Sequence, residues 1–325
     1  MKKILVFILS ALLCVSLIGC GTKDSNTQSI NIYAPDGAPA LALAKLIAED
    51  MQFDKNVNYT IVSASEIGST VVQKTGDMVI IPVNAASKIA TDGTDYKMVS
   101  VNTHGNLYII GNQAKASLSD LKGEVLGVIG QGLVPDLTLR YILQRDNIDY
   151  QIGDTKADGK ITLRYFADAS EMIPALRTNV ISFGLLPEPA MTKALSVVTN
   201  AAMLFDLQEL WGATSYPQAV LLAKTSLIES DPEFINAFLQ AMDDNVEWLP
   251  LNIETAVTAI NSHLKEGIVG SLSASLITSD VITNCNIKVI KATEAKTSVI
   301  NYLTAIKSVS DISAKIVTDN FFANI

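Results

Sequence analysis

The chain has 325 residues, of which 49% are hydrophobic and 18% are charged. This composition is typical of a well-packed globular protein and excludes an intrinsically disordered one. The formal net charge is -9, so the surface should repel phosphate backbones, and no nucleic-acid partner is expected.

The first twenty residues are typical of a processing segment. Two lysines supply a positive start, and residues 4–18 form an uncharged apolar run that is short for a membrane-spanning helix. The run ends in the letters LIGC at Cys20, which resemble the lipobox of bacterial lipoproteins. We expect a signal peptide over residues 1–19, lipid attachment at Cys20 and a polar tether over residues 20–29. The protein would then be extracytoplasmic and lipid-anchored to the cell membrane; an ordinary secretory peptide with an incidental cysteine is the alternative.

Short β-branched runs alternate with helical patterns after the tether, which predicts βαβ units and a parallel sheet. The run at residues 78–83 is apolar at nearly every position, as expected for a strand covered on both faces. Ser65 is a candidate N-cap for the second helix. The pattern predicts strands at residues 30–34, 58–64, 78–83 and 96–102, and helices at 38–51, 65–76 and 84–90.

A second series of the same type begins after residue 106. Its repetition predicts two similar α/β lobes of about one hundred residues each. The pattern predicts strands at residues 107–111, 124–130, 160–166 and 180–186, and helices at 135–144, 169–177 and from Pro189.

The last third is mostly helical. Asp231 and Pro232 have the residue types of an N-cap and a first helical position, and Thr293 is a candidate cap for a later helix. Apolar stripes at helical spacing predict core-facing helices rather than a cofactor site. The stripes are Phe234, Phe238 and Met242; Ile253, Val257, Ile260 and Leu264; and Val299, Leu303 and Ile306.

Three predicted strand-to-helix turns consist of small residues. In an open α/β sheet, ligands bind beyond the carboxyl ends of the strands, where helix N-termini present free N–H groups. We therefore expect these turns to hold a small, hydrogen-bond-accepting molecule from two sides. The alternative for each turn is that its glycine or proline only ends the strand and starts the helix, without contacting a ligand. The candidate residues are Gly37 and Ala38, Asn84 and Ala85, and Gln131 and Gly132.

Several segments, in order along the chain, resemble the extracytoplasmic solute-binding proteins of ABC importers. They include PDGAPALALAKL, VIIPVNAASKI, GEVLGVIGQGLVPDLTLRYIL, LLPEPAMTKAL and YPQAVLLAK. The most similar group contains the sulfonate, taurine, nitrate and thiamine-pyrimidine binders. The resemblance implies a two-lobe α/β Venus-flytrap fold, periplasmic-binding-protein-like type II, in which each lobe is a mostly parallel sheet flanked by helices.

The resemblance also implies how the chain divides into lobes and what the protein does. Lobe I would contain residues 30–105 and 213–325, and lobe II residues 106–212, with hinges where the chain crosses between them. Such a protein closes on a small-molecule solute and delivers it to an ABC permease in the membrane. The resemblance also implies a monomer that needs no cofactor.

Three further residues are expected at the cleft, each with a structural alternative. Glu188 could accept hydrogen bonds from an amine or a ring N–H, or stabilise a helix start; a carboxylate in the cleft would disfavour a purely anionic solute. His104 could contact the ligand or be a satisfied loop histidine. Tyr216, near Trp211, could stack on a planar solute or plug the hinge. Asn84 could equally be a plain N-cap.

No catalytic constellation stands out, so we expect a binding protein rather than an enzyme. The two histidines are far apart and Cys285 is the sole cysteine after Cys20, so neither a metal site nor an intramolecular disulfide is expected. One alternative is an enzyme on the same fold, similar to the synthases related to the thiamine-pyrimidine binders, although this chain lacks their cysteine-rich motif. Another is a surface sensor lipoprotein.

Overall fold

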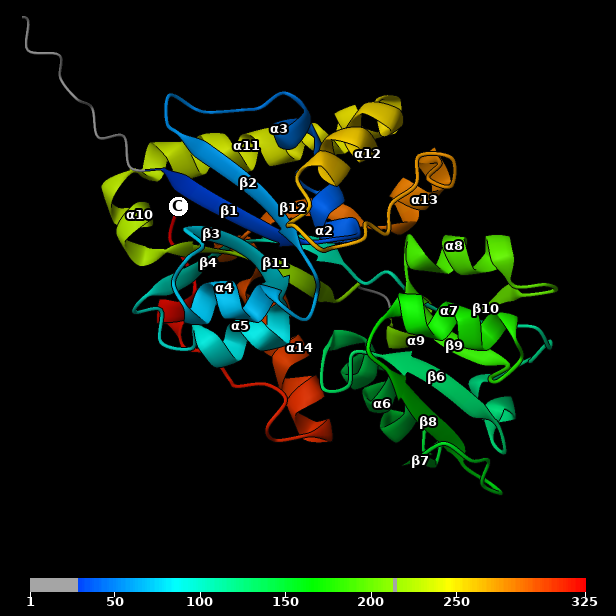
Figure 1. The fold of residues 1–325 in the computed structure, drawn as a ribbon. Helices are drawn as coiled ribbons and strands as arrows, with labels where there is room; N and C mark the ends of the chain where they lie inside the picture. Colours follow the sequence, from blue (N-terminus) through cyan, green and yellow to red (C-terminus); the bar gives the residue numbers. More distant parts are fainter. Residues whose placement is uncertain (1–28, 213–214) are drawn as a thin grey trace, which may run out of the picture.

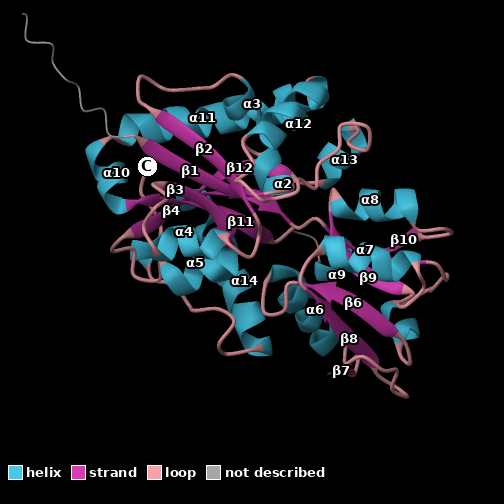
Figure 2. Cartoon of the chain, in the orientation of Figure 1, coloured by secondary structure: helices cyan, strands magenta, loops and turns pink. Residues whose placement is uncertain are grey.

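The computed structural model describes residues 29–212 and 215–325. Two six-stranded sheets organise the chain (Figure 1), and Figure 2 shows helices on both faces of each sheet. We call the part built on the first sheet lobe I and the part built on the second lobe II. The expected signal peptide and Cys20 lie outside the described residues. Within the described ranges, no helix is both long enough and apolar enough to span a bilayer.

The sheet of lobe I has the strand order β12-β4-β11-β3-β1-β2. Strand β1 pairs in parallel with β2 and β3, whereas β11 is antiparallel to both of its neighbours, β3 and β4. Strand β4 therefore runs with β1, and only β11 and β12 oppose the common direction. The strands are β1 (Ile30–Pro35), β2 (Val57–Val62), β3 (Met78–Pro82), β4 (Tyr96–His104), β11 (Pro217–Lys224) and β12 (Ile287–Lys291).

The sheet of lobe II has the order β10-β5-β9-β6-β8-β7. Strands β7, β8, β6 and β9 are parallel, and β5 opposes both β9 and β10. Both sheets are mixed, with most strands of each pointing in one direction, which confirms the two-lobe α/β architecture. The strands are β5 (Leu107–Gly111), β6 (Val125–Ile129), β7 (Tyr150–Ile152), β8 (Ile161–Phe166), β9 (Phe183–Pro187) and β10 (Ala202–Asp206).

Both faces of the lobe I sheet are buried under helices. In β3, Met78 and Ile80 belong to one hydrophobic cluster, and Val79 and Ile81 to another, which confirms that this strand is covered on both sides. On one face lie α2 (Ala38–Leu41), α3 (Ala44–Ala48), α10 (Thr225–Ser230), α11 (Pro232–Trp248), α12 (Ile253–Ser262) and α13 (Ser279–Asn284). On the other lie α4 (Ile67–Val72), α5 (Val83–Ile89) and α14 (Ala292–Val309).

The hydrophobic core continues from one lobe into the other. Tyr302 and Leu303 of α14 belong to the same buried cluster as Leu137 and Ile142 of lobe II. The lobes therefore share an apolar seam where α14 packs against α6 (Figure 1). Lobe II carries α6 (Val134–Arg145) and α9 (Leu207–Trp211) on this side, and α7 (Ala169–Arg177) and α8 (Ala190–Val197) on the other. Short 3-10 turns lie at Leu118–Leu121, Leu249–Leu251 and Asp319–Phe321.

The single helix expected over residues 38–51 is two short helices. Asn245 of α11 inserts its side chain between them. Its Nδ2 donates to the Leu41 carbonyl at 3.0 Å, and its Oδ1 accepts from the Lys45 N–H at 2.8 Å. These bonds satisfy the backbone groups that the break frees, so a contact 200 residues distant overrides the local helical preference.

Of the expected helix caps, one is confirmed and two are wrong. Asp231 accepts from the Phe234 N–H at 3.0 Å and caps α11 as predicted. Ser65 instead bonds to the hydroxyl of Ser63, and α4 begins two residues later without a side-chain cap. Thr293 lies inside α14, which starts directly after β12. In the first case the helix starts after a turn over residues 64–66, and in the second it follows the strand with no intervening turn.

Candidate functional site

The turns that follow β3 and β6 face each other across the two lobes. Figure 1 shows β1 and β6 ending on the sides of the lobes that face one another. Nδ2 of Asn84, on α5, donates to the carbonyl oxygen of Gly132 at 3.0 Å and to that of Ser313 at 3.1 Å. Two of the three predicted turns are therefore brought together by a direct hydrogen bond between the lobes.

Asn84 is fully buried and is not an N-cap. Helix α5 begins at Val83, with Pro82 in the N-cap position, so the N-cap alternative is wrong. Both acceptors of its Nδ2 are carbonyl oxygens, which fixes the orientation of the amide because an Oδ1 could not bond to them. Among the described residues, no donor reaches Asn84 Oδ1. The neighbouring Ala85 is half-buried.

The turn after β1 is a strained glycine turn held by a carboxylate. Gly37 has φ 105° and ψ −146°, a region that essentially only glycine adopts, and a Cβ there would meet no atom within 4 Å. The Gly37 N–H donates to Oδ1 of Asp36 at 2.9 Å, and Oδ2 of Asp36 accepts from the Ser271 N–H at 2.6 Å. Ala38 follows as the first residue of α2 and is buried. Conformation, not crowding, therefore requires glycine here.

The turn after β6 has the same design. Gly130 and Gly132 have φ angles of 67° and 73°, and Gln131 between them is exposed. The Gly132 N–H donates to Oδ2 of Asp136 at 2.8 Å, while the Tyr165 hydroxyl donates to Oδ1 at 2.6 Å. Asp136 is 0% exposed. Sequence reasoning missed it, although an acidic residue in the first turn of a helix after two glycines was a usable signal.

Glu188 follows β9 and is only 2% exposed. Its carboxylate accepts from the Thr192 N–H at 3.1 Å and from the Thr192 hydroxyl at 2.8 Å. Burial raises the pKa of Glu188, and the Thr192 bonds oppose that rise only in part. These contacts match the alternative in which Glu188 stabilises a helix start, here that of α8.

His104 and Tyr216 both have protein partners at the lobe crossing. His104 is buried with Nε2 3.2 Å from the Lys288 carbonyl oxygen, and burial lowers its pKa. Tyr216 is 1% exposed, stacks on Tyr302 at 5.4 Å between ring centroids, and donates its hydroxyl to Gln208 at 2.9 Å. These contacts match the structural alternatives, in which His104 is hydrogen-bonded within the protein and Tyr216 packs at the hinge. Ligand contact by either residue stays a prediction.

Two glutamines that sequence reasoning missed join the crossing segments. Gln208 of α9 accepts from the Leu107 N–H at 2.9 Å and donates to the Leu107 carbonyl at 3.2 Å. Gln218 of β11 donates to Oδ1 of Asn106 at 2.7 Å. Side chains from the returning chain thus hold the backbone of the outgoing crossing.

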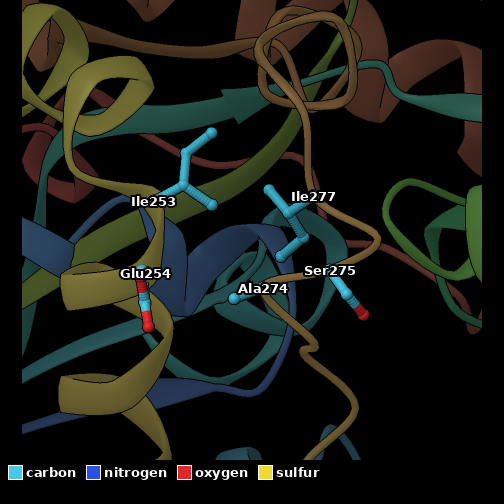
Figure 3. A pocket seen from close by; sticks show the side chains of 5 residues that line it. All are labelled: Ile253, Glu254, Ala274, Ser275 and Ile277. Atoms are coloured by element: carbon cyan, nitrogen blue, oxygen red, sulfur yellow. The ribbon is translucent and has the colours of Figure 1, made fainter.

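Other candidate features lie apart from these turns. No group of three His, Cys, Asp or Glu side chains within residues 29–212 and 215–325 could hold a metal ion. Cys285 is buried, and burial, followed by the nearby Glu188 charge, raises the pKa of its thiol. A pocket of about 410 Å³ lies in lobe I, between the start of α12 and the segment that leads to α13 (Figure 3). The pocket is lined by Ile253, Glu254, Ala274, Ser275 and Ile277. None of these is a predicted ligand-binding residue.

Solved structures share this architecture over nearly the whole chain. An ABC transporter structure from Parabacteroides distasonis has a TM-score of 0.73 at 21% identity, over 91% of this chain and 99% of that one. The periplasmic aliphatic sulphonate binding protein SsuA from Escherichia coli has a TM-score of 0.64 at 13% identity, over 91% and 92%. This chain has the two-lobe fold of ABC-transporter substrate-binding proteins.

A third similar structure also belongs to an import system. The ligand-binding component of an ABC-type import system from Staphylococcus aureus, solved with zinc bound, has a TM-score of 0.63 at 14% identity, over 91% of this chain and 96% of that one. No protein-family model matches the chain, and no curated protein matches it in sequence. The resemblance stated from the sequence is thus confirmed as a resemblance of fold.

Proposed function

We propose that this chain is an extracytoplasmic solute-binding protein that delivers a small polar molecule to an ABC permease. The observation that carries the proposal is the hydrogen bond from Asn84 to Gly132, which joins turns at the carboxyl ends of β3 and β6 in two opposed lobes. Ligands of open α/β sheets bind at such ends. The solute would lie between these turns, the Gly37 turn and the Glu188 turn, in a protein that has no catalytic task.

Closure on the solute would take place at the two crossings. We propose lobe I as residues 30–105 with 213–325 and lobe II as residues 106–212. Sheet membership supports these boundaries, since the strands of each sheet fall within them. The glutamine contacts at Leu107 and Asn106 would keep the crossings aligned while a few backbone angles change.

Attachment would come from the N-terminal segment. We propose that residues 1–19 are removed as a signal peptide and that lipid on Cys20 holds a monomeric binding protein at the outer face of the cell membrane. Metabolic labelling with palmitate tests this: label should enter the wild-type chain and be lost in Cys20→Ser. Label retained in Cys20→Ser would contradict lipid attachment at this residue.

The binding function is tested with soluble residues 21–325. Native mass spectrometry of the gently purified protein should show one bound small molecule, and solution scattering should show a smaller radius of gyration with that molecule than after its removal. Binding without any change of radius would contradict closure. Conversion of the molecule to a product by the purified protein would favour the enzyme alternative.

A further inference from the structure

Several backbone amides at these turns already have carboxylate partners. The Gly37 N–H donates to Asp36, the residue before it, and the Gly132 N–H donates to Asp136, four residues after it. Glu188 takes the corresponding N–H at the start of α8. An anionic group of a solute would have to displace these carboxylates to reach the amides. The turns are therefore preloaded with negative charge from both lobes.

Within the described residues, Asp136 has an ion-pair partner, Arg140, whereas Asp36 and Glu188 have none. Residues 35–40, 82–86, 129–134 and 187–191 contain neither lysine nor arginine. The arginine next to the Asp136 carboxylate, Arg140, contacts it at 3.4 Å, and its other nitrogens donate to the Tyr150 hydroxyl and the Val309 carbonyl. A sulfonate or carboxylate placed here would meet like charges without a dedicated partner.

Four buried side-chain polar atoms have no partner among the described residues, and one of them, Oδ1 of Asn84, is an acceptor on a side chain that also bonds to the other lobe. Oδ1 of Asn84 belongs to the same amide group whose Nδ2 reaches across to Gly132, so it lies at the junction of the two lobes. The two carbonyl acceptors of Nδ2 exclude the flipped amide. A buried carbonyl oxygen without a donor is costly, and a donor from the solute would satisfy it.

We infer that the solute is a hydrogen-bond donor, neutral or cationic, whose N–H or O–H group bonds to Oδ1 of Asn84; this inference rests on the proposed function. The chemical class comprises amines, primary amides and amino-substituted heterocycles. A solute that carries only acceptor oxygens, such as an alkanesulfonate, would leave Oδ1 of Asn84 without a donor. The sulphonate-binding neighbour thus shares the fold but not this ligand chemistry.

The first test compares two panels on soluble residues 21–325. Aliphatic sulfonates and carboxylates form one panel, and primary amines, amides and aminopyrimidines form the other, all at equal millimolar concentration in thermal unfolding. At least one member of the donor panel should raise the melting temperature, and no member of the anion panel should do so. Stabilisation by an anion, or by no donor compound, overturns the inference. If an anion binds and compacts the protein, the inference is wrong but the proposed function stands. If no member of either panel and no compound in a cell extract binds, both the inference and the proposed function are wrong.

The second test substitutes Asn84 and measures affinity for the most stabilising donor probe by calorimetry. Asn84→Leu removes the acceptor and should weaken binding by about tenfold or more. Asn84→Asp keeps an acceptor while losing the donor to Gly132, and should retain most of the affinity for a cationic probe. Asn112→Leu is the matched control. Its Oδ1 is likewise without a partner in the described part of the chain, but Asn112 follows β5 at the end of the lobe II sheet where β9 begins. Unchanged affinity in Asn84→Leu, or an equal loss in the control, overturns the inference.

Discussion

Gly105 lies directly against Tyr216 where the chain crosses between the lobes. A Cβ on Gly105 would lie 2.6 Å from Cζ of Tyr216, and the Gly105 N–H donates to the Tyr216 carbonyl at 2.9 Å. The tyrosine ring cannot retreat, because it stacks on Tyr302 and its hydroxyl is bonded to Gln208. The absence of a side chain at Gly105 therefore lets the two crossings lie side by side.

Gly105→Ala should reduce the free energy of unfolding by about 1–3 kcal/mol, because the added methyl group overlaps a ring that is held in place. Urea unfolding of the soluble chain measures this. The control is Gly153→Ala, where a Cβ would meet the Thr162 side chain at 3.8 Å, an ordinary contact distance. Equal losses in the two variants would show that close approach at the crossing is not the cause.

The hydroxyl groups of Thr138 and Tyr302 couple the lobes within the apolar seam. They lie 2.8 Å apart, on α6 and α14, and both residues are buried. In a double-mutant cycle, Thr138→Val and Tyr302→Phe should each cost about 1–2 kcal/mol and show about 1 kcal/mol of coupling in urea unfolding. Thr304→Val is the control, because its hydroxyl donates to the Ile300 carbonyl of its own helix. Coupling of Tyr302→Phe to the control as large as to Thr138→Val would refute a direct bond between the lobes.

The features predictable from sequence are those set by neighbouring residues. Short apolar runs predicted β1, β3 and β6, because a strand must be apolar on each face that is covered. The Asp231 cap was predictable because donor and acceptor lie three residues apart. By contrast, β7 is three residues long and β10 begins with two exposed residues, so neither carries a hydrophobic pattern.

The candidate site was predictable in its backbone but not in its partners. Glycines at 37 and 132 indicated the two turns, and both have positive φ angles. The Asn84 contact with Gly132 spans 48 residues, and the Asn245 contact that divides α2 from α3 spans 200. No local pattern encodes which distant backbone group a side chain meets. Tertiary contacts of this kind decide the hinge and the seam.

Asp136 should be a major stabiliser of the lobe II turn. Its two carboxylate oxygens serve the Gly132 N–H and the Tyr165 hydroxyl. Asp136→Asn removes one acceptor and leaves a buried donor without a partner, so the free energy of unfolding should fall by about 2–4 kcal/mol. Asp146→Asn, at a carboxylate paired with Arg145 on the surface, should cost under about 1 kcal/mol in the same urea titration. Similar losses at both sites would contradict a special role for Asp136.

Glu188 should make stability fall as pH rises above the acid range. Burial raises its pKa above the ordinary value of 4.5, although Thr192 bonds partly oppose the rise. Between 4.5 and the raised pKa, the native chain keeps a proton that the unfolded chain has lost, so the free energy of unfolding decreases with increasing pH across that window.

Glu188→Gln cannot ionise and should lack this decrease. The stability difference between Glu188→Gln and the wild type should therefore grow in favour of glutamine from acid to neutral pH, by about 1.4 kcal/mol per unit of pKa rise. Any loss of the Thr192 N–H bond shifts the whole curve without changing its slope, which makes the slope the decisive quantity. Urea unfolding across this pH range measures it, with Glu209→Gln, on an exposed position of α9, expected to run parallel to the wild type. A Glu188→Gln curve that is also parallel to the wild type would mean that the buried carboxylate carries no ionisation penalty.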